Sequence, residues 1–182
     1  KLNVKIIGID LKKEVIEHCN NISKKLNFNN LSFIYGDVID YENKDEIDMV
    51  ISLHACNTAT DIAILKALGW NAKVFFAVPC CQKEINSQLG NEFLPFMLKH
   101  GIIKEKFSTL LTDSIRSEVL EVFGYKSDIV EFISEENTPK NQLIRAYKTS
   151  TKLDKEKIKQ IEKFTSSLNI KMFLLDEVAK LI

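Results

Sequence analysis

The chain opens with a short apolar strand that ends in an acidic residue. Residues 4–10 are rich in β-branched side chains, which is typical of a buried strand. The last of them, Asp10, is expected at the carboxyl end of that strand, where open α/β sheets bind their ligands. A carboxylate there can accept hydrogen bonds from both hydroxyls of a ribose. The strand therefore predicts an α/β sheet that binds a nucleoside.

The remaining pattern alternates between strands and helices. We predict strands at 31–35, 48–53, 73–78, 126–134 and 142–148, and helices at 13–26, 58–68, 91–100 and 110–123. Gly101 and Gly124 are expected to end the last two helices, and Phe93, Phe96 and Met97 to pack in the core. This order predicts a mostly parallel sheet covered on both faces, with an antiparallel pair of strands at one edge.

Composition narrows the class of protein. The chain has 182 residues and equal numbers of basic and acidic side chains, 25 of each, which argues against a strongly basic nucleic-acid-binding module. No apolar stretch reaches the roughly 20 residues that a membrane span needs. The four cysteines do not resemble a disulfide framework, so we expect reduced thiols and a cytoplasmic protein.

A second acid follows the second predicted strand. Asp37 with Val38 suits adenine, because a carboxylate accepts from the exocyclic amine beside an apolar wall. Asp10 and Asp37 are then expected at the same edge of the sheet. Acids after strands also serve as turn residues and helix caps, so the structural alternative stays open for each of them.

Polar residues follow the third predicted strand. His54 can act as a base near neutral pH, and Asn57 and Asp61 can face a substrate. The alternative for Asp61 is an ordinary helix cap. Arg116 can contact an anionic substrate or form a surface pair with Asp113, three residues away on one helix.

The fourth predicted strand ends at Pro79 and is followed by Cys80, Cys81 and Gln82. Because this strand should neighbour the third, the cysteines are expected near His54 and Cys56. Three interpretations stay open: small apolar side chains in the core, ligands of zinc, or a thiolate nucleophile. Adjacent cysteines do not easily face one metal ion, so our prediction includes no metal site.

Together these residues resemble the class I S-adenosylmethionine-dependent methyltransferases. The resemblance covers about residues 3 to 148 and rests on the following strings: 7–11, IGIDL; 51–61, ISLHACNTATD; 78–82, VPCCQ; and 137–141, NTPKN. It implies a Rossmann-like, seven-stranded sheet that binds the cofactor through Asp10, Leu11, Asp37, Val38, Leu53 and His54. It also implies His54, Cys80 and Cys81 as catalytic candidates, and Asn57, Asp61, Gln82 and Arg116 as substrate contacts.

The first strand and glycine-rich loop of this family have no counterpart in the sequence. In the family that strand lies between the strands that end here at Asp10 and Leu53, so we expect the sheet to be gapped, re-paired or completed by another chain. We interpret residues 1–148 as a partial methyltransferase domain, inactive alone, and residues 149–182 as a C-terminal helical extension.

The predicted activity is methyl transfer to an unidentified acceptor, with RNA favoured over protein and small molecules. Two alternatives stay open. One is a non-catalytic Rossmann-like domain that binds a protein or nucleic acid. The other is a nicotinamide-dependent oxidoreductase, a class that also has an acid after its second strand.

Overall fold

The computed structural model describes residues 4–43, 45–53, 55, 58–90, 94–133 and 141–182. The chain divides into two compact units, residues 1–44 and 45–182, and each is described by itself. None of the helices in these described segments is long and apolar enough to cross a bilayer.

The first unit is a parallel strand pair with one helix. β1 (Ile6–Asp10) and β2 (Leu31–Tyr35) pair so that Asp10 lies opposite Tyr35. α1 (Lys13–Lys25) connects the two strands and packs against them. A glycine is required where Gly8 lies opposite Phe33, because a Cβ on Gly8 would come within 2.5 Å of that ring.

Side chains of α1 cover the outer edge of β2. The Asn20 amide donates to the carbonyl of Phe33 at 2.8 Å and accepts from its backbone N–H at 3.0 Å. The Ser23 hydroxyl lies 2.8 Å from the carbonyl of Leu31. These bonds satisfy backbone groups that an edge strand otherwise leaves to water or to another strand.

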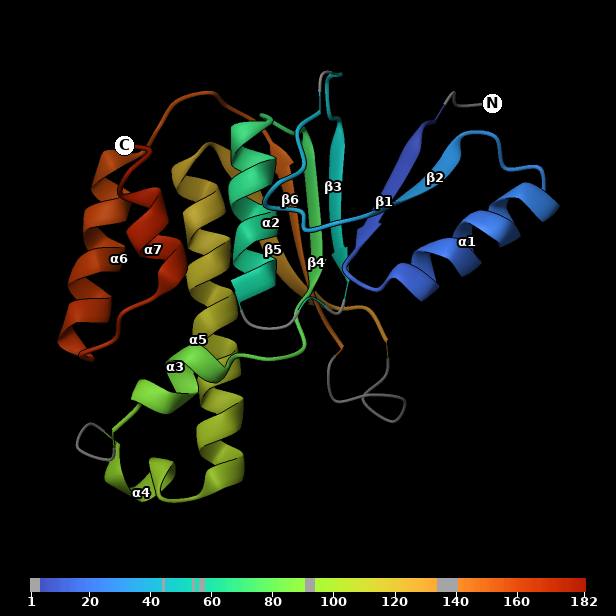
Figure 1. The fold of residues 1–182 in the computed structure, drawn as a ribbon. Coiled ribbons are helices and arrows are strands. Elements are labelled where there is room, and N and C mark those ends of the chain that lie inside the picture. Colours follow the sequence, from blue (N-terminus) through green and yellow to red (C-terminus); the bar gives the residue numbers. More distant parts are fainter. Residues whose placement is uncertain (1–3, 44, 54, 56–57, 91–93, 134–140) are drawn as a thin grey trace. The chain divides into compact units, whose positions relative to one another are not determined.

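The second unit contains a mixed sheet in the order β3-β4-β6-β5 (Figure 1). β3 (Met49–Leu53) and β4 (Val74–Val78) are parallel, whereas β6 (Gln142–Lys148) is antiparallel to both β4 and β5 (Tyr125–Glu131). The α/β fold class and the antiparallel pair at one edge are therefore confirmed. Among the described strands β1 pairs only with β2 and β3 only with β4, so each unit has a sheet of its own.

Two helices cover one face of this sheet. α2 (Thr58–Gly69) packs on β3 and β4, and α5 (Gly101–Val122) packs on β5 and β6. The alternating residues on this face are buried: Ser52, Phe75, Ala77, Ile144 and Ala146. On the other face Met49, Ile51 and Leu53 stay exposed, so within the described part of this unit the expected cover on both faces is present on one only.

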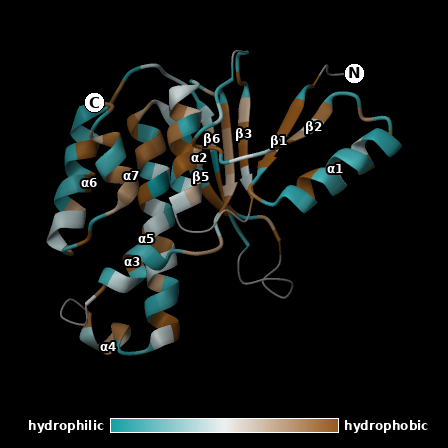
Figure 2. Cartoon of the chain, in the orientation of Figure 1, coloured by the Kyte–Doolittle hydropathy of each residue, from teal (hydrophilic) through white to brown (hydrophobic). Residues whose placement is uncertain are grey.

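The predicted helix at 91–100 is wrong in extent. α3 (Lys83–Gln88) and the single turn α4 (Pro95–Leu98) take its place, and 91–93 lie outside the described residues. His100 is extended at φ −94° and ψ 114°, so Gly101 begins α5 instead of ending a helix. Phe96 is 81% exposed, which corrects the prediction that it packs in the core. Figure 2 shows α4 as an apolar turn.

The C-terminal segment adds two helices to the same core. α6 (Lys155–Ser167) begins after Asp154, whose carboxylate accepts from the backbone N–H groups of Glu156 and Lys157. α7 (Phe173–Val178) packs against α2. Both helices bury apolar residues in the main cluster: Ile158, Ile161, Leu174 and Val178. Residues 149–182 are thus part of the second compact unit.

We predict that Gly124→Ala lowers the free energy of unfolding by about 2 kcal/mol or more. Gly124 follows α5 at φ +82°, and a Cβ there would lie 2.2 Å from the carbonyl oxygen of Ser150. The control is Gly69→Ala, where an added Cβ meets no atom within 4 Å. Urea denaturation followed by circular dichroism measures both variants, and equal midpoints would contradict this account.

Candidate functional site

One candidate site lies in the first unit, at the carboxyl ends of β1 and β2. The backbone N–H of Gly36 donates to the carbonyl of Asp10 at 3.1 Å, so Asp37 comes one residue after a direct contact with Asp10. This confirms that the two acids share one edge. Each carboxylate also holds its own turn: Asp10 Oδ1 accepts from Lys12 N at 2.7 Å, and Asp37 Oδ1 from Ile39 N at 3.0 Å.

Apolar side chains accompany both acids. Leu11 is largely exposed after Asp10, and Val38 is half-buried after Asp37. Both are therefore available to a flat ligand at this edge. The geometry fits a nucleoside, because hydrogen-bond acceptors and apolar contacts lie next to each other. The individual roles of Asp10, Leu11, Asp37 and Val38 stay predictions.

A separate candidate site lies in the other unit, at the carboxyl ends of β3 and β4. Leu53 pairs with Val78, which confirms that these strands are neighbours. Leu53 is exposed at its strand end. His54, Cys56 and Asn57, which the sequence analysis selected, lie outside the described residues.

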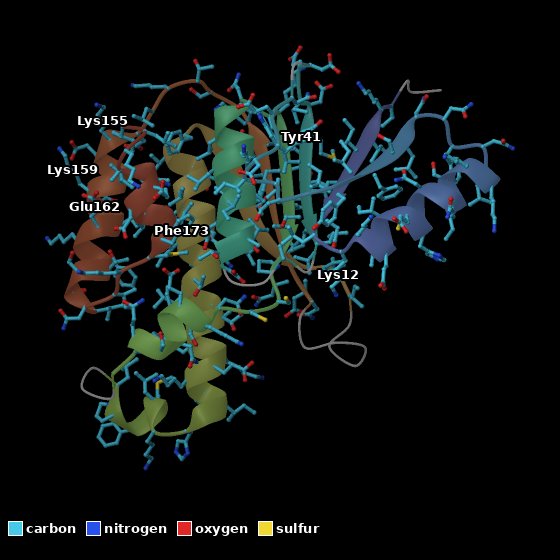
Figure 3. The ribbon with its side chains drawn as sticks, viewed as in Figure 1. Lys12, Tyr41, Lys155, Lys159, Glu162 and Phe173 are labelled. Atoms are coloured by element: carbon cyan, nitrogen blue, oxygen red, sulfur yellow. The ribbon has the colours of Figure 1, made fainter. Side chains whose placement is uncertain are left out.

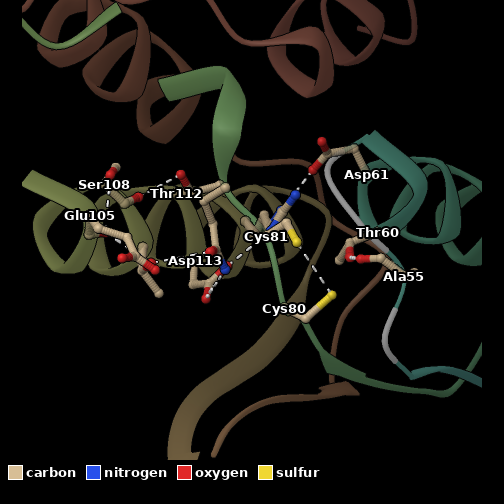
Figure 4. Close-up of polar contacts among 12 residues, drawn as sticks. Ala55, Thr60, Asp61, Cys80, Cys81, Glu105, Ser108, Thr112 and Asp113 are labelled. Atoms are coloured by element: carbon tan, nitrogen blue, oxygen red, sulfur yellow. Dashed lines mark hydrogen bonds and ion pairs between the residues drawn. The ribbon is translucent and has the colours of Figure 1, made fainter. Parts of the chain in front are cut away.

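The two cysteines lie in the link between β4 and α3 (Figure 4). The Sγ atoms of Cys80 and Cys81 are 3.7 Å apart, and both residues are partly exposed. This exposure is compatible with a reactive thiol as well as with a structural one. Within the described segments no three His, Cys, Asp or Glu side chains are placed to hold a metal ion.

Gln82 ties this link to α5. Its amide nitrogen donates to Asp113 Oδ2 at 3.3 Å, and its amide oxygen accepts from the Thr109 hydroxyl at 3.1 Å. The sequence analysis did not select Thr109 for the site. The signal for it was the spacing of Thr109, Asp113 and Arg116, which places three polar residues on one helical face.

Arg116 joins α5 to α2. Its Nε lies 2.7 Å from Asp61 Oδ1, and its guanidinium also contacts Asp113 Oδ1 at 3.0 Å. All three side chains are 1% exposed, so the expected surface pair of Asp113 and Arg116 is wrong: the pair exists but is buried. We call Asp61, Asp113 and Arg116 the buried triad. Thr60 fixes the start of α2 by donating to the carbonyl of Ala55 at 2.8 Å.

Burial controls the protonation of the triad. The pKa values of Asp61 and Asp113 are raised above their ordinary range, because lost hydration outweighs the attraction of Arg116. Asp61 Oδ2 is buried without a hydrogen-bond partner. Nearby, burial also raises the pKa of Glu84, although its carboxylate accepts from Phe173 N at 2.8 Å. The triad therefore connects α2 and α5 inside the protein, with one cation for two acids.

We predict that Arg116→Met lowers the free energy of unfolding by about 3–5 kcal/mol at neutral pH, because it leaves two buried carboxylates unpaired. Arg145→Met is the control: Arg145 pairs with Asp128 at 3.6 Å and is 42% exposed, so the loss there is about 1 kcal/mol or less. Chemical denaturation compares the two variants. Similar losses of unfolding free energy would show that the buried triad stabilises the protein no more than the exposed ion pair does.

The stability deficit of Arg116→Met is also expected to depend on pH. Without the guanidinium, the pKa values of Asp61 and Asp113 rise further above their unfolded values, so the folded variant binds more protons than the unfolded chain. Its stability therefore falls as pH rises through the folded-state pKa values. Denaturation at pH 5 and pH 8 should give the smaller deficit at pH 5, and a deficit independent of pH would refute this.

Comparison with known proteins identifies the fold. Residues 1–88 match the family model of a methyltransferase domain, and no curated protein matches the chain. An rRNA methylase from Streptococcus thermophilus superposes with a TM-score of 0.50 at 15% identity, over 80% of this chain and 74% of that chain. A putative rRNA-methylase from Clostridium thermocellum superposes with a TM-score of 0.51 at 14% identity, over 80% and 73%.

At these identities the two solved structures are evidence for the fold, and the family model is evidence for the domain. The match of residues 1–88 to the family model and the likeness to the two solved structures together support a Rossmann-like methyltransferase fold, as the sequence resemblance implied.

Proposed function

We propose that this protein takes part in S-adenosylmethionine-dependent methyl transfer and that residues 10–38 bind the nucleoside half of that molecule. The observation that carries the proposal is the shared edge of Asp10 and Asp37, joined through the bond from Gly36 N to the Asp10 carbonyl. Asp10 Oδ2 accepts hydrogen bonds from the ribose hydroxyls, and Asp37 accepts one from the adenine amine. Leu11 and Val38 contact the faces of the base.

Each of these carboxylates is already oriented before a ligand arrives. Oδ1 of Asp10 and Oδ1 of Asp37 are held by backbone N–H groups two residues further along the chain. The remaining oxygen of each carboxylate then points along a direction that its turn has fixed. Such orientation lowers the entropy lost on binding, which is why turn-bound acids suit a nucleoside site.

RNA is the proposed methyl acceptor. Two solved structures with this fold are described as rRNA methylases, and this supports RNA over the other acceptor classes. The edge formed by the ends of β3 and β4 is the proposed place of transfer, with Leu53 and His54 beside the reacting groups. When bound, S-adenosylmethionine supplies an activated methyl group, so the protein has mainly to align the acceptor and accept its proton.

Cys80 and Cys81 are the described side chains at this edge with nucleophilic chemistry. We propose one of two routes: His54 takes the acceptor's proton, or one of the thiolates adds to the acceptor ring. In the second route the thiolate is expelled again when the methylated ring carbon loses its proton, as in methylation at carbon. Asn57 stays a proposed contact of the acceptor. Asp61, Gln82 and Arg116 now take a positioning role, since the buried triad and Gln82 fix the link that carries both cysteines.

Titration calorimetry with S-adenosylmethionine tests the cofactor proposal. We predict that Asp10→Asn and Asp37→Asn each weaken binding at least about tenfold, because a charged acceptor of the ligand's hydrogen bonds is lost. Asp40→Asn is the control, since it removes the same charge three residues after Asp37 and Asp40 was not selected for the site. The titration uses this chain.

Two results would argue against the proposal. One is the absence of S-adenosylmethionine binding by the wild-type chain, which would favour the non-catalytic domain. The other is equal weakening by all three substitutions, which would indicate a general charge effect and no specific contact.

A further inference from the structure

The most exposed large apolar side chains of the described segments lie together at one end of the second unit. Phe96 is 81% exposed and Ile102 is 68% exposed, and Met97 between them is 43% exposed. They belong to residues 95–106, which span α4, the turn at His100 and the first residues of α5. We call this segment the α4–α5 tip. An exposed aromatic in such a cluster indicates contact with a partner.

The charge of the α4–α5 tip is positive in a chain of zero net charge. It carries Lys99, Lys104 and Lys106 against the single acid Glu105. The first turn of α5 has no acidic residue, and its N-cap, His100, makes no side-chain cap bond. The backbone N–H groups of that turn therefore add positive potential beside the lysines. Both features complement a polyanion.

The tip stands beyond the edge of the sheet at which transfer is proposed. Gln82, in the link between β4 and α3, is bonded to Asp113 in the middle of α5. Gly101 lies 12 positions before Asp113, which corresponds to about 18 Å of helix. Figure 1 shows α4 and the first turns of α5 past the end of β4. An extended polymer bound at the tip can thus reach the edge that carries Cys80 and Cys81.

We propose that the α4–α5 tip binds single-stranded RNA next to the residue that is methylated, an inference that rests on the proposed function. Phe96 stacks on a base, because the face of every base accepts an aromatic ring and the stack needs no defined sequence. Lys99 and Lys106 contact the flanking phosphates. A membrane surface is less suitable, because the single turn α4 is too short to lie in a bilayer as an amphipathic helix.

Fluorescence anisotropy with a fluorescein-labelled 12-nucleotide single-stranded RNA tests this inference on the whole chain. Phe96→Ala is expected to weaken binding at least about fivefold. Phe164→Ala is the matched control, because Phe164 is also exposed, at 48%, but lies on α6. Both variants should melt at the wild-type temperature, since neither side chain is buried.

The lysines are tested by the salt dependence of the same titration. Lys99→Ala with Lys106→Ala should lower the slope of log affinity against log salt by about 1.4, at roughly 0.7 for each phosphate contact on a single strand. The control is Lys155→Ala with Lys159→Ala, which removes the same charge from α6, where both side chains point away from the helices (Figure 3).

The outcomes separate this inference from the proposed function. Unchanged RNA affinity in Phe96→Ala, or equal effects of the tip and α6 variants, would overturn the tip as an RNA site. Binding of the wild type to phosphatidylserine vesicles that Phe96→Ala abolishes, without RNA binding, would overturn it in favour of a membrane. S-adenosylmethionine affinity is measured in parallel. The tip variants should leave this affinity unchanged, because only the variants at Asp10 and Asp37 test the nucleoside site.

Discussion

The second unit depends on a single buried cation. Arg116 of α5 pairs with Asp61 of α2 and with Asp113 at distances of 2.7 and 3.0 Å, and all three side chains are buried. Two acids share one guanidinium, so the arrangement is stable only while Arg116 stays in place. Gln82 extends this network to the link between β4 and α3. Through it, the helices that cover the sheet and the link that carries Cys80 and Cys81 are held by the same polar contacts.

Local patterns in the sequence predicted most of the secondary structure. The apolar strands and the antiparallel pair at the edge were identified because each is a short run bounded by turn residues. The helix at 91–100 was misplaced because glycine serves two purposes: it commonly follows a helix, and Gly101 here begins one. The exposure of Phe96 had no local signal, since an aromatic residue within an apolar run is usually buried.

For the candidate site, the sequence predicted one feature and missed another. The common edge of Asp10 and Asp37 follows from the parallel pairing of strands, which the sequence pattern already contained. The burial of Arg116 did not, because an Asp and an Arg three positions apart look the same on an exposed helix as on a buried one. Its partner Asp61 lies 55 positions away along the chain. Contacts at that separation are decided by tertiary packing, which leaves no mark in a window of neighbouring residues.

The edge of β2 has a consequence for how the smaller sheet can grow. Asn20 occupies both backbone hydrogen-bonding groups of Phe33, and Ser23 occupies the carbonyl of Leu31. A strand that approached on this side would first have to displace those side chains, whereas no α1 side chain in the described residues blocks the backbone of β1 in this way. The two edges of the two-stranded sheet are therefore not equivalent. Side chains of α1 block strand addition at β2, whereas the edge of β1 is open to another strand.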